Sequence, residues 1–170
     1  GYSGHVLTIG RQEIWETTVQ DLQRWAREMD FQLKPATKLF LSDRRFMRGD
    51  YITDRALFLS LGFNNIDSLD YSDFEQCTMT HDLNLDVPVK LHNKYDLIVD
   101  AGTSEHVFNL PKVLENYNKM LKVGGRIILS LPASNFVDHG FYMFSPTLFW
   151  DYYSANQWEI KDSLLVRGTR

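Results

Sequence analysis

The sequence holds one cysteine, five prolines and no long run of apolar side chains among its 170 residues. A single cysteine, Cys77, cannot form a disulfide within the chain, which excludes the small disulfide-stabilised scaffolds and favours a reducing compartment. No apolar run approaches the roughly 20 residues that cross a bilayer as a helix. We therefore expect a cytoplasmic protein without a membrane-spanning segment.

Positive charge is also scarce in this sequence. There are 18 Lys and Arg residues against 22 Asp and Glu residues, which gives a formal net charge of -4. Surfaces that bind nucleic acids are usually basic, and only the short pair Arg44–Arg45 stands out here. The composition favours a small-molecule ligand over a nucleic acid and leaves the oligomeric state open.

The rest of the composition fits one globular domain over residues 1–170. Hydrophobic residues make up 44% of the chain and charged residues 24%, enough for a single sizeable core. The chain does not begin with Met and starts almost directly on a predicted strand, so we interpret it as an excised or processed piece of a longer polypeptide. The absence of a targeting signal is then weak evidence.

Residues 95–131 predict a strand, a polar loop, a helix and a second strand in succession. The segment Tyr95–Asp100 is a short apolar run that ends in an acid, which is typical of a strand buried in a parallel sheet. Asn109 is the predicted N-cap of a helix that should end at Gly124–Gly125, before a strand over Arg126–Leu131. Ligands of such sheets bind outside the carboxyl ends of the strands, so we expect function in the first loop.

The same patterns predict further strands and helices along the chain. A capping-box pattern at Thr17–Gln20 begins one helix, Gly62 ends another, and Ser145 caps a third. The further predicted strands are His5–Ile9, Lys38–Leu41, Asn65–Leu69, Thr78–His81 and Trp158–Val166. The further predicted helices are residues 17–30, 52–61 and 146–153. This alternation of strands and helices predicts an α/β fold.

The segment between the first strand and the strand that ends at Asp70 is long for a single crossover. We interpret residues 13–50 as an insertion in this crossover. It is either a lid or cap that binds a substrate, or an added layer that only buries core.

Six segments together resemble the class I methyltransferases that use S-adenosylmethionine. They cover most of residues 5–155, and the likeness is strongest to a bacterial subgroup with a Gly-Arg-Gln first loop and a His-Gly-Phe-Tyr-x-Phe-Ser-Pro segment. The acid-ended second strand, the Glu-His loop and the Gly-Gly turn, in this order, are together the most specific features. The segments are VLTIGRQ (6–12), SLDYSDFE (68–75), HDLN (81–84), YDLIVDAGTSEHVFN (95–109), MLKVGGRIILSLP (120–132) and HGFYMFSP (139–146).

The resemblance implies a Rossmann-like, doubly wound and mostly parallel sheet of seven strands, with the cofactor across the ends of the first, second and fourth. This chain ends near the sixth strand, so we expect the last edge strand to be missing or built differently. The family has several glycines in the first loop, whereas here Gly10 is followed by Arg11 and Gln12. Arg11 is expected either to pair with the methionine carboxylate or to hold the loop through an acid such as Glu13 or Glu105.

Ten positions are expected to contact S-adenosylmethionine on the strength of this resemblance. Asp70 ends the second strand and can accept hydrogen bonds from both ribose hydroxyls, or it caps the following turn. Asp82 follows the third strand and either faces the adenine amine or forms an Asx turn with Asn84. The ten are Gly10, Arg11, Gln12, Asp70, Tyr71, Asp82, Leu83, Asp100, Gly102 and Thr103.

Three residues are candidates for catalysis. Methyl transfer from a sulfonium is an in-line substitution that needs little more than removal of the acceptor's proton. His106 and His139 are the candidate bases, and Glu105 is expected to act with them or to orient the methionine ammonium. Glu105 and His106 have an alternative role in stabilising their loop, and the aromatic residues that follow His139 have one in packing the next helix against the sheet. Phe144 is expected to pack the following helix, and no metal site is expected.

The sequence therefore predicts methyl transfer to a small polar acceptor, with a saccharide or sugar-nucleotide hydroxyl as the first choice. The alternative is a binding or scaffold module, a degenerate methyltransferase fold whose altered first loop has lost the cofactor. A nicotinamide-dependent dehydrogenase is disfavoured, because no G-x-G-x-x-G motif follows the first strand.

Overall fold

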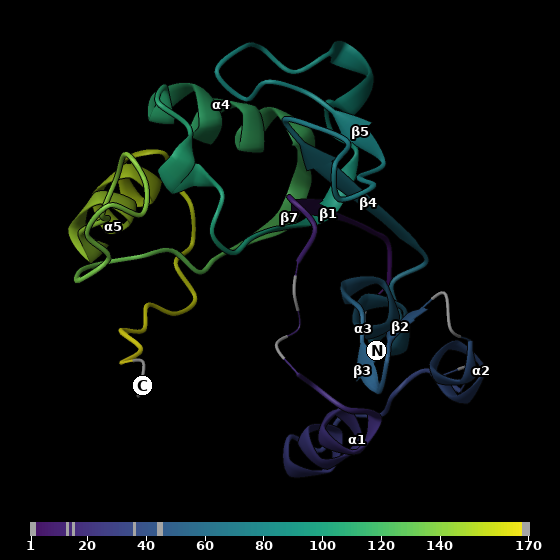
Figure 1. The fold of residues 1–170 in the computed structure, drawn as a ribbon. Helices are drawn as coiled ribbons and strands as arrows, with labels where there is room; N and C mark the ends of the chain where they lie inside the picture. The colour runs from purple at the N-terminus through teal and green to yellow at the C-terminus, as the bar shows by residue number, and fades with distance from the viewer. Residues whose placement is uncertain (1–2, 13, 15, 36, 44–45, 168–170) are drawn as a thin grey trace.

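The computed structural model describes residues 3–12, 14, 16–35, 37–43 and 46–167, which form an α/β fold around a five-stranded sheet (Figure 1). All strand pairs in this sheet are parallel. Across the sheet the strands are β5 (Met79–Thr80), β4 (Asn65–Asp70), β1 (His5–Ile9), β6 (Tyr95–Asp100) and β7 (Leu121–Leu129).

Counted along the chain, these five strands have the order 3-2-1-4-5, which is that of a doubly wound, Rossmann-like sheet. The order reverses at β1, so β1 and β6 lie on the two sides of the switch point. Ligands of open α/β sheets bind in the crevice outside the carboxyl ends of such a strand pair.

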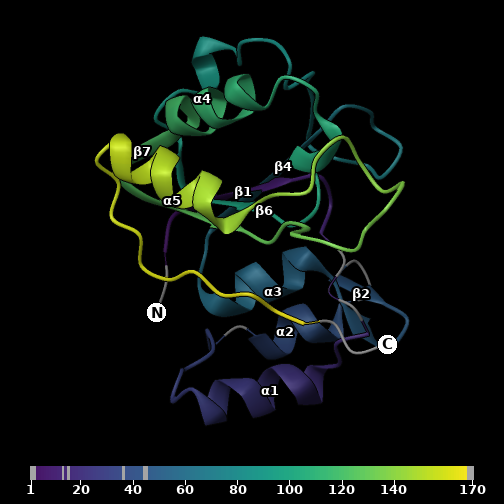
Figure 2. The same cartoon turned by 90° about the vertical axis from the view of Figure 1, so that its left-hand side faces the viewer.

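Helices cover both faces of the sheet (Figure 2). Helix α4 (Leu110–Met120) packs against Leu7 and Ile9 of β1. Helix α3 (Asp54–Leu61) lies on the opposite face, where its Phe58 contacts Val6. Successive side chains of a strand point to opposite faces, so this run of β1 is buried on both sides, as the sequence predicted.

The ends of α3 and α4 agree with the capping residues in the sequence. The Asn109 side chain accepts a hydrogen bond from the Lys112 backbone N–H, and Thr53 caps α3 in the same way. Gly62 ends α3 with a left-handed φ of 115°, a conformation that glycine adopts at little cost. Helix α3 begins at Asp54, after the strand pairing of Ile52, and so two residues later than predicted.

Strand β7 begins directly after α4, and the prediction that the helix runs to Gly124–Gly125 is wrong. Leu121 pairs with Tyr95, and the pairing resumes only at Arg126 with Leu97. The residues between form an irregularity in the ladder, where Gly124 has a φ of 79°. The two glycines therefore accommodate a bulge in an edge strand.

Three further predictions differ from the structure. Helix α1 (Val19–Glu28) is capped by Thr18 with Asp21, one residue beyond the predicted capping box. Residues 38–41, predicted as a strand, belong to helix α2 (Thr37–Ser42). Within the described chain, residues 158–166 form no strand, and the sheet ends at β7.

The insertion after β1 packs as an added layer on α3. It contains α1, α2 and an antiparallel hairpin of β2 (Met47–Arg48) and β3 (Tyr51–Ile52). Leu22 of α1 and Ile52 of β3 are buried against Ala56 of α3. Figure 2 shows α3, α2 and α1 at increasing distance from the sheet. The role as a lid stays a prediction.

Helix α5 (Pro146–Ala155) lies on the α4 side of the sheet (Figure 2). Ser145 caps it, as predicted, and its Tyr153 packs with Phe144 and with Leu114 of α4. Phe144 is 3% exposed, which confirms its packing role. Among the described residues, no helix is long and apolar enough to span a membrane.

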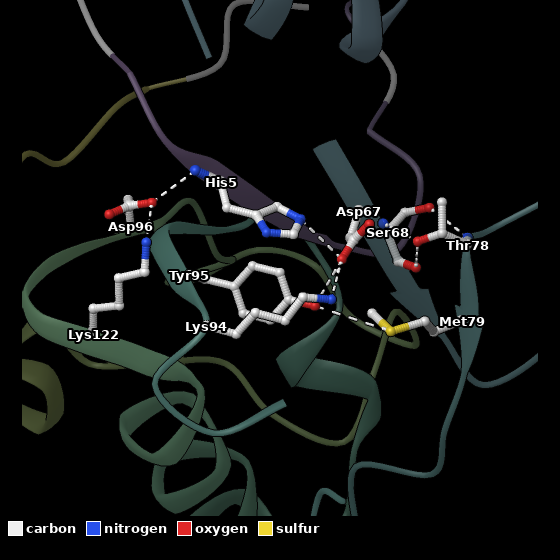
Figure 3. Close-up of polar contacts among 9 residues, drawn as sticks. All are labelled: His5, Asp67, Ser68, Thr78, Met79, Lys94, Tyr95, Asp96 and Lys122. Atoms are coloured by element: carbon white, nitrogen blue, oxygen red, sulfur yellow. Dashed lines mark hydrogen bonds and ion pairs between the residues drawn. The ribbon is translucent and has the colours of Figure 1, made fainter. Parts of the chain in front are cut away.

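Polar side chains gather around Asp67 near the amino ends of the strands (Figure 3). The carboxylate oxygen Oδ2 of Asp67 accepts hydrogen bonds from Lys94 Nζ at 2.8 Å and from Tyr95 OH at 3.0 Å, and it lies 3.0 Å from His5 Nε2. Burial opposes ionisation of Asp67, but these hydrogen bonds and charges outweigh it and lower its pKa. Burial also lowers the pKa of His5 below its ordinary value of 6.5, against the attraction of Asp67.

We expect the free energy of unfolding to fall as the pH decreases through 6.5, because unfolded His5 takes up a proton that folded His5 resists. Chemical denaturation between pH 7 and pH 5 measures this slope. His5→Gln should flatten the slope, and an unchanged slope in that variant would assign the effect to other groups.

Candidate functional site

The carboxyl ends of β1, β4 and β6 meet at Gly10. The Gly10 N–H donates to the Leu69 carbonyl at 2.7 Å, and Gly10 has a φ of 73°, which favours glycine. A Cβ at this position would lie 3.2 Å from Thr103 Oγ1 and 3.7 Å from Asp70 Oδ2. Three of the predicted cofactor positions are thus brought together at the switch point.

Arg11 is held by Asp54, the first residue of α3, and among the described residues it does not pair with Glu105. Arg11 Nη2 lies 2.7 Å from Asp54 Oδ1, and the Gln12 N–H donates to Asp54 Oδ2 at 3.1 Å. The Gln12 side chain donates to the Ile9 carbonyl at 2.6 Å. The Arg11–Glu105 alternative is wrong, and Glu13 lies outside the described residues. The observed contacts support the loop-holding role of Arg11.

Asp70 caps a turn with one oxygen and faces Gly10 with the other. Its Oδ1 accepts from the Ser72 N–H at 3.2 Å, as the turn interpretation predicted. Its Oδ2 accepts no hydrogen bond from the described residues, and so it is available to a ligand at the switch point. Tyr71 lies next to it with 79% of its surface exposed.

Asp82 forms the Asx turn that was one of its two predicted roles. Its Oδ1 accepts from the backbone and the side chain of Asn84, and these hydrogen bonds lower the pKa of Asp82. Asn84 Oδ1 in turn accepts from the Asn109 N–H at the start of α4. Leu83 is 4% exposed in the core, so its side chain serves packing.

Asp100 organises the loop after β6 from inside the protein. Its carboxylate accepts hydrogen bonds from the Thr103 N–H, the Ser104 hydroxyl and the Tyr117 hydroxyl. Burial raises its pKa and outweighs these bonds. The Asp100 carboxylate is not exposed, so it cannot contact a cofactor directly as predicted. Only the backbone of this turn could make such a contact.

The loop after β6 is also tied to β1. Thr103 Oγ1 donates to the Ile9 carbonyl at 2.9 Å, and Gly102 has a φ of 106°, which permits the tight turn. Gly102 and Thr103 therefore lie at the switch point, as the resemblance implied.

The three candidate catalytic residues form one cluster. Glu105 and His106 belong to the short 3-10 helix η3 (Ser104–His106), and His139 comes from the loop before α5. Glu105 Oε1 lies 3.4 Å from His139 Nε2 and 3.9 Å from His106 Nε2. The two imidazole rings are 4.8 Å apart, centroid to centroid.

Backbone hydrogen bonds fix the loop of His139 on Glu105. The Glu105 carbonyl accepts from the Phe141 N–H at 2.7 Å and from the Tyr142 N–H at 3.2 Å. A Cβ at Gly140 would lie 2.8 Å from the same carbonyl oxygen, so only glycine fits there without a shift. An open hollow of about 380 Å³ lies over this contact, lined by His106, Asp138, His139, Gly140 and Phe141.

Sequence reasoning missed three residues that shape this edge of the sheet. Asp54 binds the first loop from 43 residues away, and nothing in its own neighbourhood indicates that partner. Asn84 was expected only as a turn residue, although it also joins two loops. Gly140 lies inside the His-Gly-Phe-Tyr segment. A glycine at such a position can indicate that another part of the backbone, here that of Glu105, approaches closely.

Comparison of the chain with models of protein families, with curated proteins and with solved structures finds no match.

Proposed function

We propose that this protein transfers a methyl group from S-adenosylmethionine to a small polar acceptor. The observation that supports this most is the convergence of the Gly10 turn, Asp70 Oδ2 and Thr103 at the switch point of a 3-2-1-4-5 sheet. A carboxylate at the end of the second strand suits a vicinal diol such as that of ribose. No G-x-G-x-x-G motif follows the first strand, which disfavours a nicotinamide dinucleotide as the cofactor.

The cluster beside this crevice supplies the groups that the transfer needs. The acceptor must lose a proton as its oxygen or nitrogen attacks the methyl carbon in line with the departing sulfur. His139 and His106 are both partly exposed at the hollow, and buried Glu105 orients the His139 ring. Phe141 adds an aromatic face to this polar hollow, which suits a saccharide hydroxyl as the acceptor.

A binding or scaffold module is the second candidate. The observation in its favour is the Arg11–Asp54 ion pair, which occupies the first loop where the resembling family has flexible glycines. In this case the Gly10 turn and Asp70 would be remnants of a cofactor site.

Binding of S-adenosylhomocysteine separates the two proposals. At ten times its dissociation constant the ligand should add about 1.4 kcal/mol to the free energy of unfolding, because it binds only the folded state. Calorimetry gives the dissociation constant and thermal unfolding gives the stabilisation, with NAD as the control ligand. Absence of binding to a folded sample would favour the scaffold module, and tight binding of NAD alone would favour a dehydrogenase.

A further inference from the structure

We propose that Glu105, His106 and His139 bind a divalent transition-metal ion. One donor atom from each residue, a carboxylate oxygen or an imidazole nitrogen, lies within 4.8 Å of the other two. Two imidazoles and one carboxylate are a donor set that recurs in metal sites of proteins.

The buried carboxylate of Glu105 supports a cation-binding role for the cluster. Its side chain is 1% exposed, and its Oε2 is buried without a hydrogen-bond partner among the described residues. Its Oε1 lies 3.4 Å from His139 Nε2 and 3.9 Å from His106 Nε2. A buried carboxylate with an unpaired oxygen is costly, and a bound cation would remove that cost.

The distances fit a site that closes slightly around an ion. Nitrogen and oxygen ligands lie about 2.0–2.2 Å from zinc, so tetrahedral ligands stand about 3.4 Å apart. The Glu105–His139 distance already has this value, and the side chains of His106 and His139 are 45% and 41% exposed, which leaves them room to turn. The main chain beneath them is held by the Phe141–Glu105 hydrogen bond, so little order has to be gained on binding.

The donor chemistry selects the class of metal. Imidazole nitrogen suits Zn²⁺, Cu²⁺, Fe²⁺ and Ni²⁺ better than Mg²⁺, Ca²⁺ or Mn²⁺, which prefer oxygen ligands. Three protein ligands leave at least one coordination position open, and the cluster borders the hollow that Asp138 and Phe141 also line. An exogenous oxygen can therefore reach the ion.

The position of the ion also extends the proposed function, on which this step rests. An acceptor hydroxyl bound to the metal would lose its proton more easily, because the cation stabilises the oxyanion. His106 and His139 would then act as ligands and not as bases, and the proton of the acceptor would pass to solvent in the open hollow as the new oxygen–methyl bond forms and the sulfur–methyl bond breaks. The acceptor would be a molecule that offers an oxygen ligand, such as a saccharide hydroxyl.

Titration of the chelator-treated protein with Zn²⁺ and with Co²⁺ tests the site, using calorimetry and the visible spectrum of bound Co²⁺. We expect one ion per chain. His106→Asn and His139→Asn, which change partly exposed side chains, should each weaken binding at least about tenfold. His92 lies outside the cluster, so the control variant His92→Asn should leave the affinity for the metal unchanged.

Two results would overturn the proposal. One is the absence of binding at micromolar metal in a folded sample, and the other is binding that neither His106→Asn nor His139→Asn weakens. The measurement needs no S-adenosylmethionine, so its outcome is separate from that of the proposed function. Metal binding without S-adenosylhomocysteine binding would support the metal site and overturn the proposed methyltransferase. Binding of S-adenosylhomocysteine without metal binding would support the methyltransferase and overturn the metal site.

Discussion

Asp54→Ala is expected to lower the free energy of unfolding by about 3 kcal/mol, the lower end of the range for breaking a buried ion pair. The Asp54 side chain is 2% exposed and accepts hydrogen bonds from Arg11, from the Gln12 N–H and from the Arg55 N–H. Alanine leaves all three donors without this partner. The lower end applies because the Arg11 side chain is 29% exposed and regains contact with water. Urea denaturation monitored by circular dichroism measures the loss.

The matched control is Asp50→Ala, which removes an exposed carboxylate four residues before Asp54 and should change the stability by less than about 0.5 kcal/mol. A loss below about 1 kcal/mol in Asp54→Ala would show that the ion pair contributes little.

The same contact changes what is expected of Arg11. Because its guanidinium is engaged by Asp54, Arg11→Ala should weaken S-adenosylhomocysteine and adenosine alike, through a disordered first loop. A loss confined to the carboxylate-bearing ligand would instead show that Arg11 reaches the methionine carboxylate.

Asp70→Asn is expected to weaken S-adenosylhomocysteine roughly tenfold to 100-fold, or about 1.5–3 kcal/mol, the value of a hydrogen bond to a charged group. The asparagine oxygen can still accept from the Ser72 N–H, so the turn should keep its shape. The group that faces Gly10 would change from a charged acceptor to an amide donor. Calorimetric titration of both proteins measures the difference.

Asp73→Asn is the control, since it removes the same charge from an exposed position three residues away. Its affinity should match that of the unmodified protein. Equal affinity in Asp70→Asn would remove Asp70 from the ligand site, and equal losses in both variants would assign the effect to net charge.

The sequence by itself determined the elements that depend on local signals. The runs His5–Ile9 and Tyr95–Asp100 are strands with the predicted bounds, because a short, mostly apolar run that is closed by a glycine or an acid suits a buried parallel strand. Asn109 and Ser145 begin helices as predicted, because a side-chain oxygen satisfies the backbone N–H groups of the first turn wherever the helix packs. The sequence also placed the carboxyl ends of these strands at one edge of a parallel sheet, where ligands of such folds bind.

Tertiary structure decided the features that depend on distant partners. The short apolar run 38–41 fits a strand or a helix by pattern, and it is helical in the layer that covers α3. The residues before Arg126 join β7 because Tyr95 offers a pairing partner to Leu121. Arg11 meets Asp54 across 43 residues, and Glu105 meets His139 across 34. Such contacts join residues that are far apart in the sequence, and they form only because the fold brings these residues together. Local sequence patterns therefore cannot predict them.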